Sequence, residues 1–415
     1  MATKTITPKI SLISAFVVHG SVEIPYFIFP VIVILVGNDL FPDLGALSWI
    51  GLGTIGTVGT LAAALPAPFF GRLADKYRRG VMMFISLWFT VLGSFSIGLF
   101  GESFIIMIVG IILLGLGISL YHPLGLSWIT SAFEKNDEKT RTYSSRYVRI
   151  LALHGVGGTL GAAIGPLSVY VLLNSLGWRQ IYFYWAFPLA VIALCFWIVV
   201  ARHEPKIEKS FILEELPINS RNNRNSSNFN FSIILVFIFA FITTLSITRG
   251  MINFILSPFL SEVKDFKIAT AALFIGLSTL LGSIGEILGG VLGDKYGERI
   301  VLSGHALIQV GILILIYTTE SQLVLLLLYI FLGINSSLFW PSTNSLVAKN
   351  STRRGIAFGR VILIANFFGA LGPGIDGILL ALTPNQYSMI FIVACTFSLL
   401  GVLFLILSTR NSENT

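Results

Sequence analysis

A few ionisable side chains lie inside long apolar segments of this sequence. His19 and Glu23 are four residues apart, which places them on one face of a helix, well inside the first apolar segment. Ionisable groups in an apolar environment are costly and usually serve a function. Desolvation favours the neutral form of a carboxyl group, so Glu23 is predicted to bind and release protons. The alternative is a structural hydrogen bond between helices.

Arg249 is the only basic residue deep inside the second half of the chain. It either contacts an anionic group of a ligand or is permanently paired with Glu23 or another buried acid, and the sequence leaves both possibilities open. Asn253 lies one turn further along the same face. Asp376 is the second candidate for a proton site, and it becomes the better one if Arg249 neutralises Glu23.

Two further candidates, His122 and Trp340, each precede a proline inside an apolar segment. A proline there can kink a helix and free backbone groups towards a cavity. Both side chains are therefore candidates for ligand binding, with simple packing as the alternative. His154 is a weaker candidate of the same kind.

The segments that carry these residues are typical of membrane-spanning helices. The 415 residues are 55% hydrophobic and 11% charged, with a mean hydropathy of +0.85, whereas soluble domains carry about 25% charged residues. Each apolar segment reaches the length needed to cross a bilayer, about 20 helical residues. The sequence thus predicts an all-α polytopic membrane protein whose twelve transmembrane helices cover residues 11–36, 47–70, 81–100, 104–132, 148–174, 179–201, 231–260, 268–292, 300–318, 321–348, 356–382 and 387–408.

The basic residues predict the orientation in the membrane. Of the 27 lysines and arginines, 23 fall at the two termini and in the loops on the same side of the predicted helices. Positive charge gathers on the cytoplasmic side of membrane proteins, so we expect a multi-pass protein of the cell membrane with both termini in the cytoplasm. The net charge of +7 is then a topology signal and not the footprint of a nucleic-acid partner.

One charged turn occurs twice. Gly71 to Gly80 carries Gly-Arg-Leu-Ala-Asp-Lys-Tyr, and Gly290 to Arg299 repeats its Gly, Leu and Asp-Lys-Tyr positions 219 residues later. The repeat predicts two six-helix bundles, residues 1–201 and 231–415, joined by a polar linker at 202–230. Two homologous halves around a site at the midplane are typical of transporters.

The doubled turn resembles the signature of the major facilitator superfamily. Gly71, Leu73, Asp75 and Arg79 match it in the first half, and the second copy matches at Gly290, Leu292, Asp294, Gly297 and Arg299. The first copy departs from the pattern, with Arg78 where a glycine is expected. Within the superfamily, the spacing of His19, Glu23 and Pro30 and the sequence Tyr-His-Pro at 121–123 resemble the fosmidomycin-resistance-like exporters.

The resemblance implies a gate at the charged turns. A carboxylate there caps a neighbouring helix or pairs with an arginine in one conformation only, and the alternative is a plain helix-ending turn. The predicted gating residues are Gly71, Asp75, Arg79, Glu286, Gly290, Asp294 and Arg299.

Together, these features predict a secondary active transporter that moves a small organic solute by alternating access and exports it in exchange for protons. Uptake of an organic anion or metabolite is the alternative, followed by a membrane sensor on the same scaffold. We expect no enzymatic activity, no cofactor and no metal site, since no nucleophile–base set stands out and the two cysteines form no cluster. No phosphate-binding loop is present, so ATP is not expected as the energy source. The expected partners are the lipid bilayer, the solute and protons.

Overall fold

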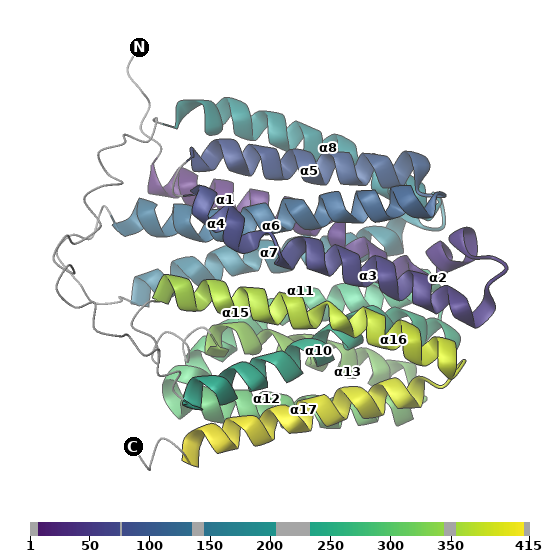
Figure 1. Ribbon diagram of the computed structural model, residues 1–415. Coiled ribbons are helices and arrows are strands. Elements are labelled where there is room, and N and C mark those ends of the chain that lie inside the picture. The colour runs from purple at the N-terminus through teal and green to yellow at the C-terminus, as the bar shows by residue number, and fades with distance from the viewer. Residues whose placement is uncertain (1–6, 75–76, 135–144, 205–232, 344–353, 411–415) are drawn as a thin grey trace, which may run out of the picture.

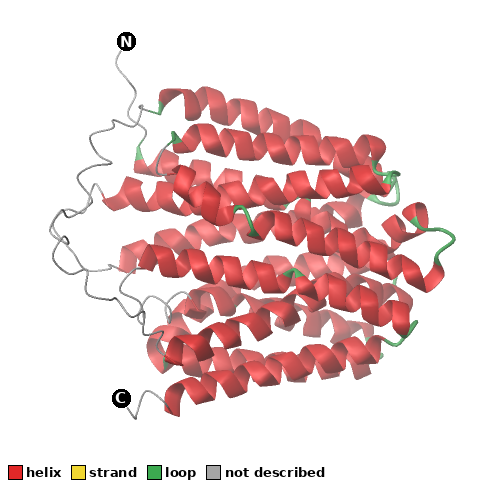
Figure 2. Cartoon of the chain, viewed as in Figure 1, coloured by secondary structure: helices red, strands yellow, loops and turns green. Residues whose placement is uncertain are grey.

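The computed structural model describes residues 7–74, 77–134, 145–204, 233–343 and 354–410, and within them every element is a helix (Figures 1 and 2). The helices up to residue 204 are α1 (Pro8–Glu23), η1 (Tyr26–Ile28), α2 (Phe29–Leu40), η2 (Gly45–Leu47), α3 (Ser48–Ala64), α4 (Ala67–Ala74), α5 (Arg79–Phe100), α6 (Phe104–Glu134), α7 (Ser145–Leu172), α8 (Trp178–Val199) and η3 (Ala201–His203). The later ones are α10 (Ile233–Glu262), α11 (Ile268–Tyr296), α12 (Glu298–Thr318), α13 (Gln322–Ser337), α15 (Arg354–Gly369), α16 (Leu371–Leu382) and α17 (Tyr387–Arg410).

The number of membrane spans agrees with the sequence. Eleven spans in the described residues are long and apolar enough to cross a membrane, and the bent pair of α1 with residues 26–40 makes a twelfth. The prediction of twelve transmembrane helices is confirmed.

The first span differs from the prediction, which had one continuous helix over 11–36. The structure breaks it after Glu23, and the two parts meet at an angle of 40°. Pro25 explains the break, because it lacks the N–H group that would continue the helical hydrogen bonds. The second predicted span, 47–70, is likewise divided into α3 and α4 next to Pro66.

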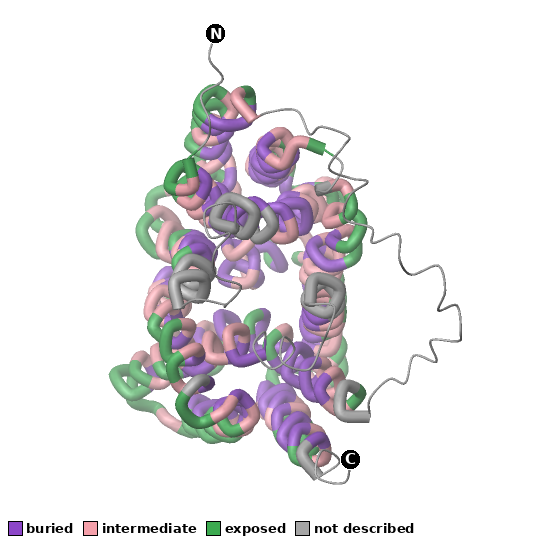
Figure 3. Tube along the Cα trace, turned by 90° about the vertical axis from the view of Figure 1, so that its left-hand side faces the viewer, coloured by how far each residue is buried: buried purple, intermediate pink, exposed green. Residues whose placement is uncertain are grey.

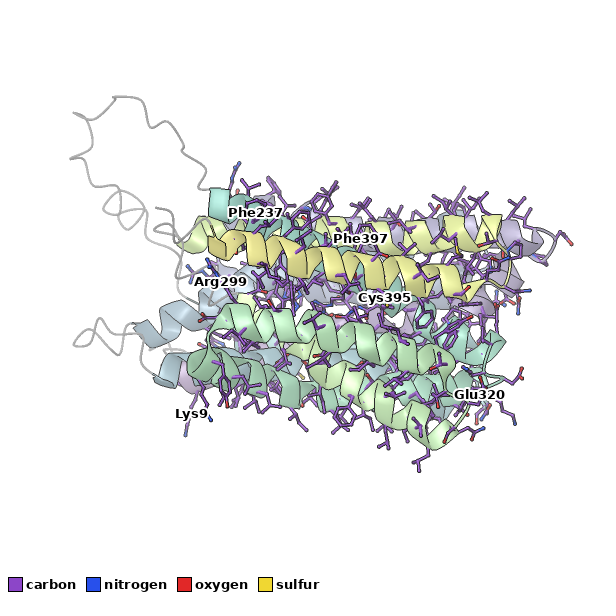
Figure 4. The ribbon with its side chains drawn as sticks, turned by 90° about the horizontal axis from the view of Figure 1, so that it is seen from below. Lys9, Phe237, Arg299, Glu320, Cys395 and Phe397 are labelled. Carbon is purple, nitrogen blue, oxygen red and sulfur yellow. The ribbon has the colours of Figure 1, made fainter. Side chains whose placement is uncertain are left out.

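The described ends of the chain lie at the same end of the helical bundle, which we call the terminal end, and the opposite end is the far end (Figure 1). Charged residues lie at both ends, with Lys9 and Arg299 at the terminal end and Glu320 at the far end (Figure 4). Between them, the outward faces of the helices are apolar and exposed, as at Leu323, which is 67% exposed. Seen from the terminal end, buried residues gather on the inward faces of the helices (Figure 3). An apolar exterior between two charged rims is the surface that a bilayer requires.

The two halves are joined at the far end. One hydrophobic core contains Phe29 and Ile32 from the first half and Phe254 from the second. In addition, the hydroxyl of Ser257 on α10 donates a hydrogen bond of 2.7 Å to the carbonyl of Val31 on α2.

Glycines allow α3 and α16 to touch at the same end. A Cβ atom added at Gly53 would lie 2.5 Å from the carbonyl oxygen of Pro373, and one at Gly377 would collide with the carbonyl of Trp49. Such backbone contact between the halves closes the far end of the molecule.

Candidate functional site

The first half brings together a cluster of polar side chains from three helices. His19 and Glu23 come from α1, and Tyr121 and His122 come from α6, with His154 on α7 behind them. Nε2 of His122 lies 3.1 Å from Oε1 of Glu23, and Nε2 of His19 lies 3.7 Å from the same oxygen. His19 and Glu23 are each only 7% exposed. The structure thus unites four of the predicted site residues, His19, Glu23, His122 and His154.

A chain of hydrogen bonds fixes the tautomers in this cluster. The Tyr121 hydroxyl donates its single hydrogen to the carbonyl of Ala15 at 2.6 Å, so it accepts a hydrogen bond from Nε2–H of His154 at 2.8 Å. Nδ1–H of His19 donates to the carbonyl of His154 at 2.9 Å. In the neutral ring, Nε2 of His19 then carries a lone pair, and it faces Glu23.

Close approach of α1 and α7 holds the cluster together. Added Cβ atoms at Gly157 and Gly161 would meet the main chain of α1, the first at 2.8 Å from the carbonyl of Phe16. At Gly158 a Cβ would collide with the imidazole ring of His19. Small residues at these positions let two helices pack at backbone distance, which brings the His19 ring to the main chain of α7.

The second half contributes Arg249, Asn253 and Trp340. Arg249 and Asn253 are exposed although most of their neighbours on α10 are buried. The guanidinium carbon of Arg249 lies 5.5 Å from the centroid of the Trp340 ring. Arg249 also interacts electrostatically with Glu23 of the first half and with Glu286 on α11, so it faces accessible space between the halves.

Arg249 is not the permanent partner of Glu23. Within the described residues it makes no ion pair of 4.0 Å or less, and the near neighbours of the Glu23 carboxylate are His122 and His19. Of the two alternatives that the sequence left open, the fixed pair is therefore not formed with Glu23. An arginine that rests on an aromatic ring keeps its N–H groups free for an anion.

Asp376 lies away from this cluster, in the core of the second half. It is fully buried, and neither carboxylate oxygen has a hydrogen-bond partner within the described residues. Tyr387 on α17 is close enough to interact with it electrostatically, but the Tyr387 hydroxyl donates its hydrogen to Glu262 at 2.6 Å. Nothing here compensates a negative charge on Asp376.

The structure describes only some of the predicted gating residues, and Glu286 is the one that it shows in contact with the other half. Asp75 lies outside the described residues, and Asp294 belongs to α11 but its side chain is also outside them. Gly71 faces Pro123 of α6, whereas Gly290 has open space beside it. Arg299 lies at the terminal end (Figure 4). Glu286 does connect the halves, since its Oε1 accepts a hydrogen bond of 2.7 Å from the Thr159 hydroxyl on α7.

The acid that caps a helix at the terminal end is Glu204, which the sequence analysis missed. Its two carboxylate oxygens accept hydrogen bonds from the backbone N–H groups of Arg79 and Gly80, at 3.0 and 2.7 Å. Burial raises the pKa of the Glu204 carboxyl, and these two hydrogen bonds and the charge of Arg78 oppose that rise. The displaced glycine at position 80 was the available signal, because a Cβ there would press on Glu204.

One group of side chains offers donor atoms to a metal ion. The ligating atoms of His19, Glu23 and His122 all lie within 4.8 Å of one another. His19 and Glu23 are one helical turn apart, whereas His122 is 99 positions from Glu23 in the chain, so only the packing of α1 against α6 brings His122 to the other two.

Comparison with known proteins identifies the fold family. The family model described as Major Facilitator Superfamily matches residues 12–285 and 242–415. The chain belongs to the major facilitator superfamily. Among curated proteins, it is 24% identical over 336 residues to the multidrug resistance protein MdtG of Escherichia coli O6:K15:H31, covering 77% of this chain and 74% of that protein. MdtG of Salmonella arizonae is also 24% identical, over 338 residues, with 78% and 76% covered.

Solved structures of superfamily transporters share the fold. A bacterial homologue of the human lysosomal transporter Spinster, in an inward-facing and occupied conformation, superimposes with a TM-score of 0.72 at 15% identity, covering 96% of each chain. The nucleoside transporter NupG gives a TM-score of 0.68 at 16% identity, covering 96% of this chain and 99% of NupG. None of these relatives is named as an enzyme. They do not confirm the narrower resemblance to fosmidomycin-resistance-like exporters, which stays a prediction.

Proposed function

We propose that this protein exports a small organic solute across the cell membrane in exchange for protons, by alternating access between its two halves. One observation carries the proposal. Polar side chains from both halves, Glu23 and His122 on one side and Arg249 and Asn253 on the other, lie deep within spans that are otherwise apolar. A polar site between two halves that pack against each other is what a rocking transporter needs.

The solute is bound, in this proposal, between the cluster of the first half and Arg249, Asn253 and Trp340 of the second. Arg249 supplies N–H donors and a positive charge without an ion partner among the described residues, while the indole ring supports the guanidinium from one face. The pair suits a solute that combines a carboxylate or phosphate group with an apolar or aromatic body.

We assign the exchanged proton to Asp376 in preference to Glu23. Glu23 has a hydrogen-bond partner in His122. Asp376 has no hydrogen-bond donor among the described residues and no exposed surface. The present packing therefore disfavours the carboxylate relative to the neutral acid. Opening of the far end would separate α3 from α16 and hydrate Asp376, which allows it to release the proton.

The gate at the terminal end is proposed to involve the second half's Glu286 with Thr159, together with the charged turns at Asp75 and Asp294. The hydrogen bond between Thr159 and Glu286 crosses the two halves, so it must break when they move apart there. The export direction rests on the similarity to proteins named as multidrug resistance proteins, and the cytoplasmic placement of both termini rests on the basic residues.

Flux in reconstituted vesicles tests the proposal. Purified protein in liposomes is given an inward or outward pH gradient, and the movement of a carboxylate-bearing fluorescent solute is followed together with internal pH. We expect solute to move against the proton flow and to stop when an uncoupler collapses the gradient. If solute and protons move in the same direction, the protein is an uptake system and not an exporter. If the solute flux does not depend on the pH gradient, transport is not coupled to protons.

A further inference from the structure

We propose that His19, Glu23 and His122 form a binding site for a late first-row divalent cation, with Zn²⁺ as its representative ligand. The site is built from α1 and α6 of the first half, which pack against each other (Figure 1). This goes beyond the proposed transport function, and it departs from the sequence analysis, which predicted no metal site.

The spacing of the donor atoms is close to that of a metal centre. Zinc lies about 2.0–2.2 Å from nitrogen and oxygen ligands, so the ligands of a tetrahedral site are roughly 3.3 Å apart. Here the Glu23 oxygen is 3.1 Å from Nε2 of His122 and 3.7 Å from Nε2 of His19. The two imidazole rings are nearly perpendicular, with their centroids 5.1 Å apart. All three donor atoms lie within 4.8 Å of one another, so the imidazole rings must turn towards each other to bind one ion.

His19 is already oriented as a metal ligand. Its Nδ1–H is held by the carbonyl of His154, and this kind of second contact is the one that fixes the ring and tautomer of metal-binding histidines. The free Nε2 lone pair then faces a carboxylate oxygen across 3.7 Å without a hydrogen bond. Two electron-rich atoms in a buried site repel each other, and a proton or a metal ion between them removes that repulsion.

His122 completes the site and leaves it open on one side. Its Nε2–H now donates to Glu23, and a shift of that hydrogen to Nδ1 turns Nε2 into the third ligand. The His122 side chain is 30% exposed, so water or a solute group has access to the fourth position. Three protein ligands with an open position are typical of catalytic zinc centres, in contrast to closed structural ones.

The donor set selects the class of ion. Two imidazoles and one carboxylate suit Zn²⁺, Co²⁺ or Ni²⁺, whereas Mg²⁺ and Ca²⁺ prefer sites made of oxygen atoms alone. Arg249 acts electrostatically on Glu23 from the opposite half and opposes a second positive charge. We therefore infer a reversibly bound ion.

Metal titration of the purified full-length protein, in detergent and after removal of any affinity tag, tests the site. Zn²⁺ binding is measured by calorimetry, and Co²⁺ binding by the visible absorption of the bound ion. We expect one site per chain in the wild type. His19→Ala and His122→Gln should each weaken Zn²⁺ binding at least tenfold, and His203→Ala should not, because His203 lies at η3 outside the cluster.

The choice of variants separates a loss of metal binding from a loss of the fold. His122→Gln alters the most exposed of the three ligands, so the fold should persist even if His19→Ala disturbs the packing, and thermal unfolding of each variant checks this. Absence of a stoichiometric site in the wild type overturns the proposal, as does wild-type affinity in His122→Gln. No solute or gradient is present, so the result is independent of whether the protein transports as proposed.

Discussion

At the scale of single residues, the two buried carboxyl groups differ in what surrounds them. Glu23 has two histidines as neighbours, whereas Asp376 is fully buried without a hydrogen-bond donor among the described residues. In an apolar interior, a carboxylate without donors costs far more free energy than its protonated form. The environment of each group, and not its residue type, assigns the proposed roles.

Asp376→Asn tests the proton role, because the amide mimics the protonated acid. We expect the variant to lose transport driven by a pH gradient while it still exchanges solute for solute across the membrane. Both fluxes are measured in the same vesicles, with Asp43→Asn, at an exposed position near the far end, as the matched control. Gradient-driven transport at the wild-type rate would remove Asp376 from the coupling mechanism.

Arg249 offers the second test at this scale. If it binds the anionic group of the solute, Arg249→Gln should raise the dissociation constant of an anionic solute about 10- to 100-fold, which corresponds to a charge-assisted hydrogen bond of about 1.5–3 kcal/mol. A neutral solute of the same shape should bind as before. An equal loss of affinity for both solutes would show that Arg249 supports the structure of the site and does not bind the anionic group.

At the scale of elements, the capped start of α5 explains the glycine at position 80 of the first charged turn. Glu204, just after η3, reaches the first backbone N–H groups of α5, where the helix dipole favours a negative charge. Gly80 leaves room for this carboxylate and for the Trp128 ring of α6. The first copy of the repeated turn departs from the family pattern, with Arg78 where a glycine is expected and the glycine at position 80. At that position the glycine makes room for Glu204.

Glu204→Gln should therefore lower the stability of the protein by on the order of 1 kcal/mol, the usual value of a helix cap. Thermal unfolding in detergent measures the change. Glu102→Gln is the matched control, because that side chain is 69% exposed and its ion pair with Arg179 lies at the surface, where such pairs contribute less than about 1 kcal/mol. Equal effects in the two variants would contradict the capping role.

At the scale of the whole molecule, the far end is closed by contacts between halves, and the proposed transport cycle must open it. Gly53 and Gly377 give the closest approach there. Because a rigid pairing of α3 with α16 would trap the molecule, this contact has to be reversible. The same end is predicted to face the outside of the cell, since the basic residues gather at the other end.

Cysteine labelling tests that orientation. Leu44, in the connection between α2 and α3, is 48% exposed at the far end. A cysteine there should react with a membrane-impermeant thiol reagent in intact cells, and a cysteine at Ser226, in the predicted linker outside the described residues, should react only after lysis. The background is a variant without Cys195 and Cys395. Labelling at position 226 in intact cells would reverse the orientation.

The sequence by itself determined the fold class, because apolar segments of spanning length must become helices to satisfy their backbone in a bilayer. The repeated turns predicted two related halves, and their resemblance to the superfamily signature predicted the family. Single residues such as His19 and Glu23 were found because ionisable groups stand out in apolar segments. Helix breaks after Glu23 and next to Pro66 were less visible, since apolar composition continues across them.

Only the tertiary structure decided which of these residues meet. Arg249 and Glu23 were equally good partners in the sequence, but the packing of α1 against α6 brings histidines to Glu23 while Trp340 supports Arg249. The cap by Glu204 and the convergence of three metal donors depend on contacts between helices far apart in the chain. Such contacts are governed by helix rotation and by close glycine packing, and hydrophobic periodicity is uninformative about rotation when nearly every face of a helix is apolar.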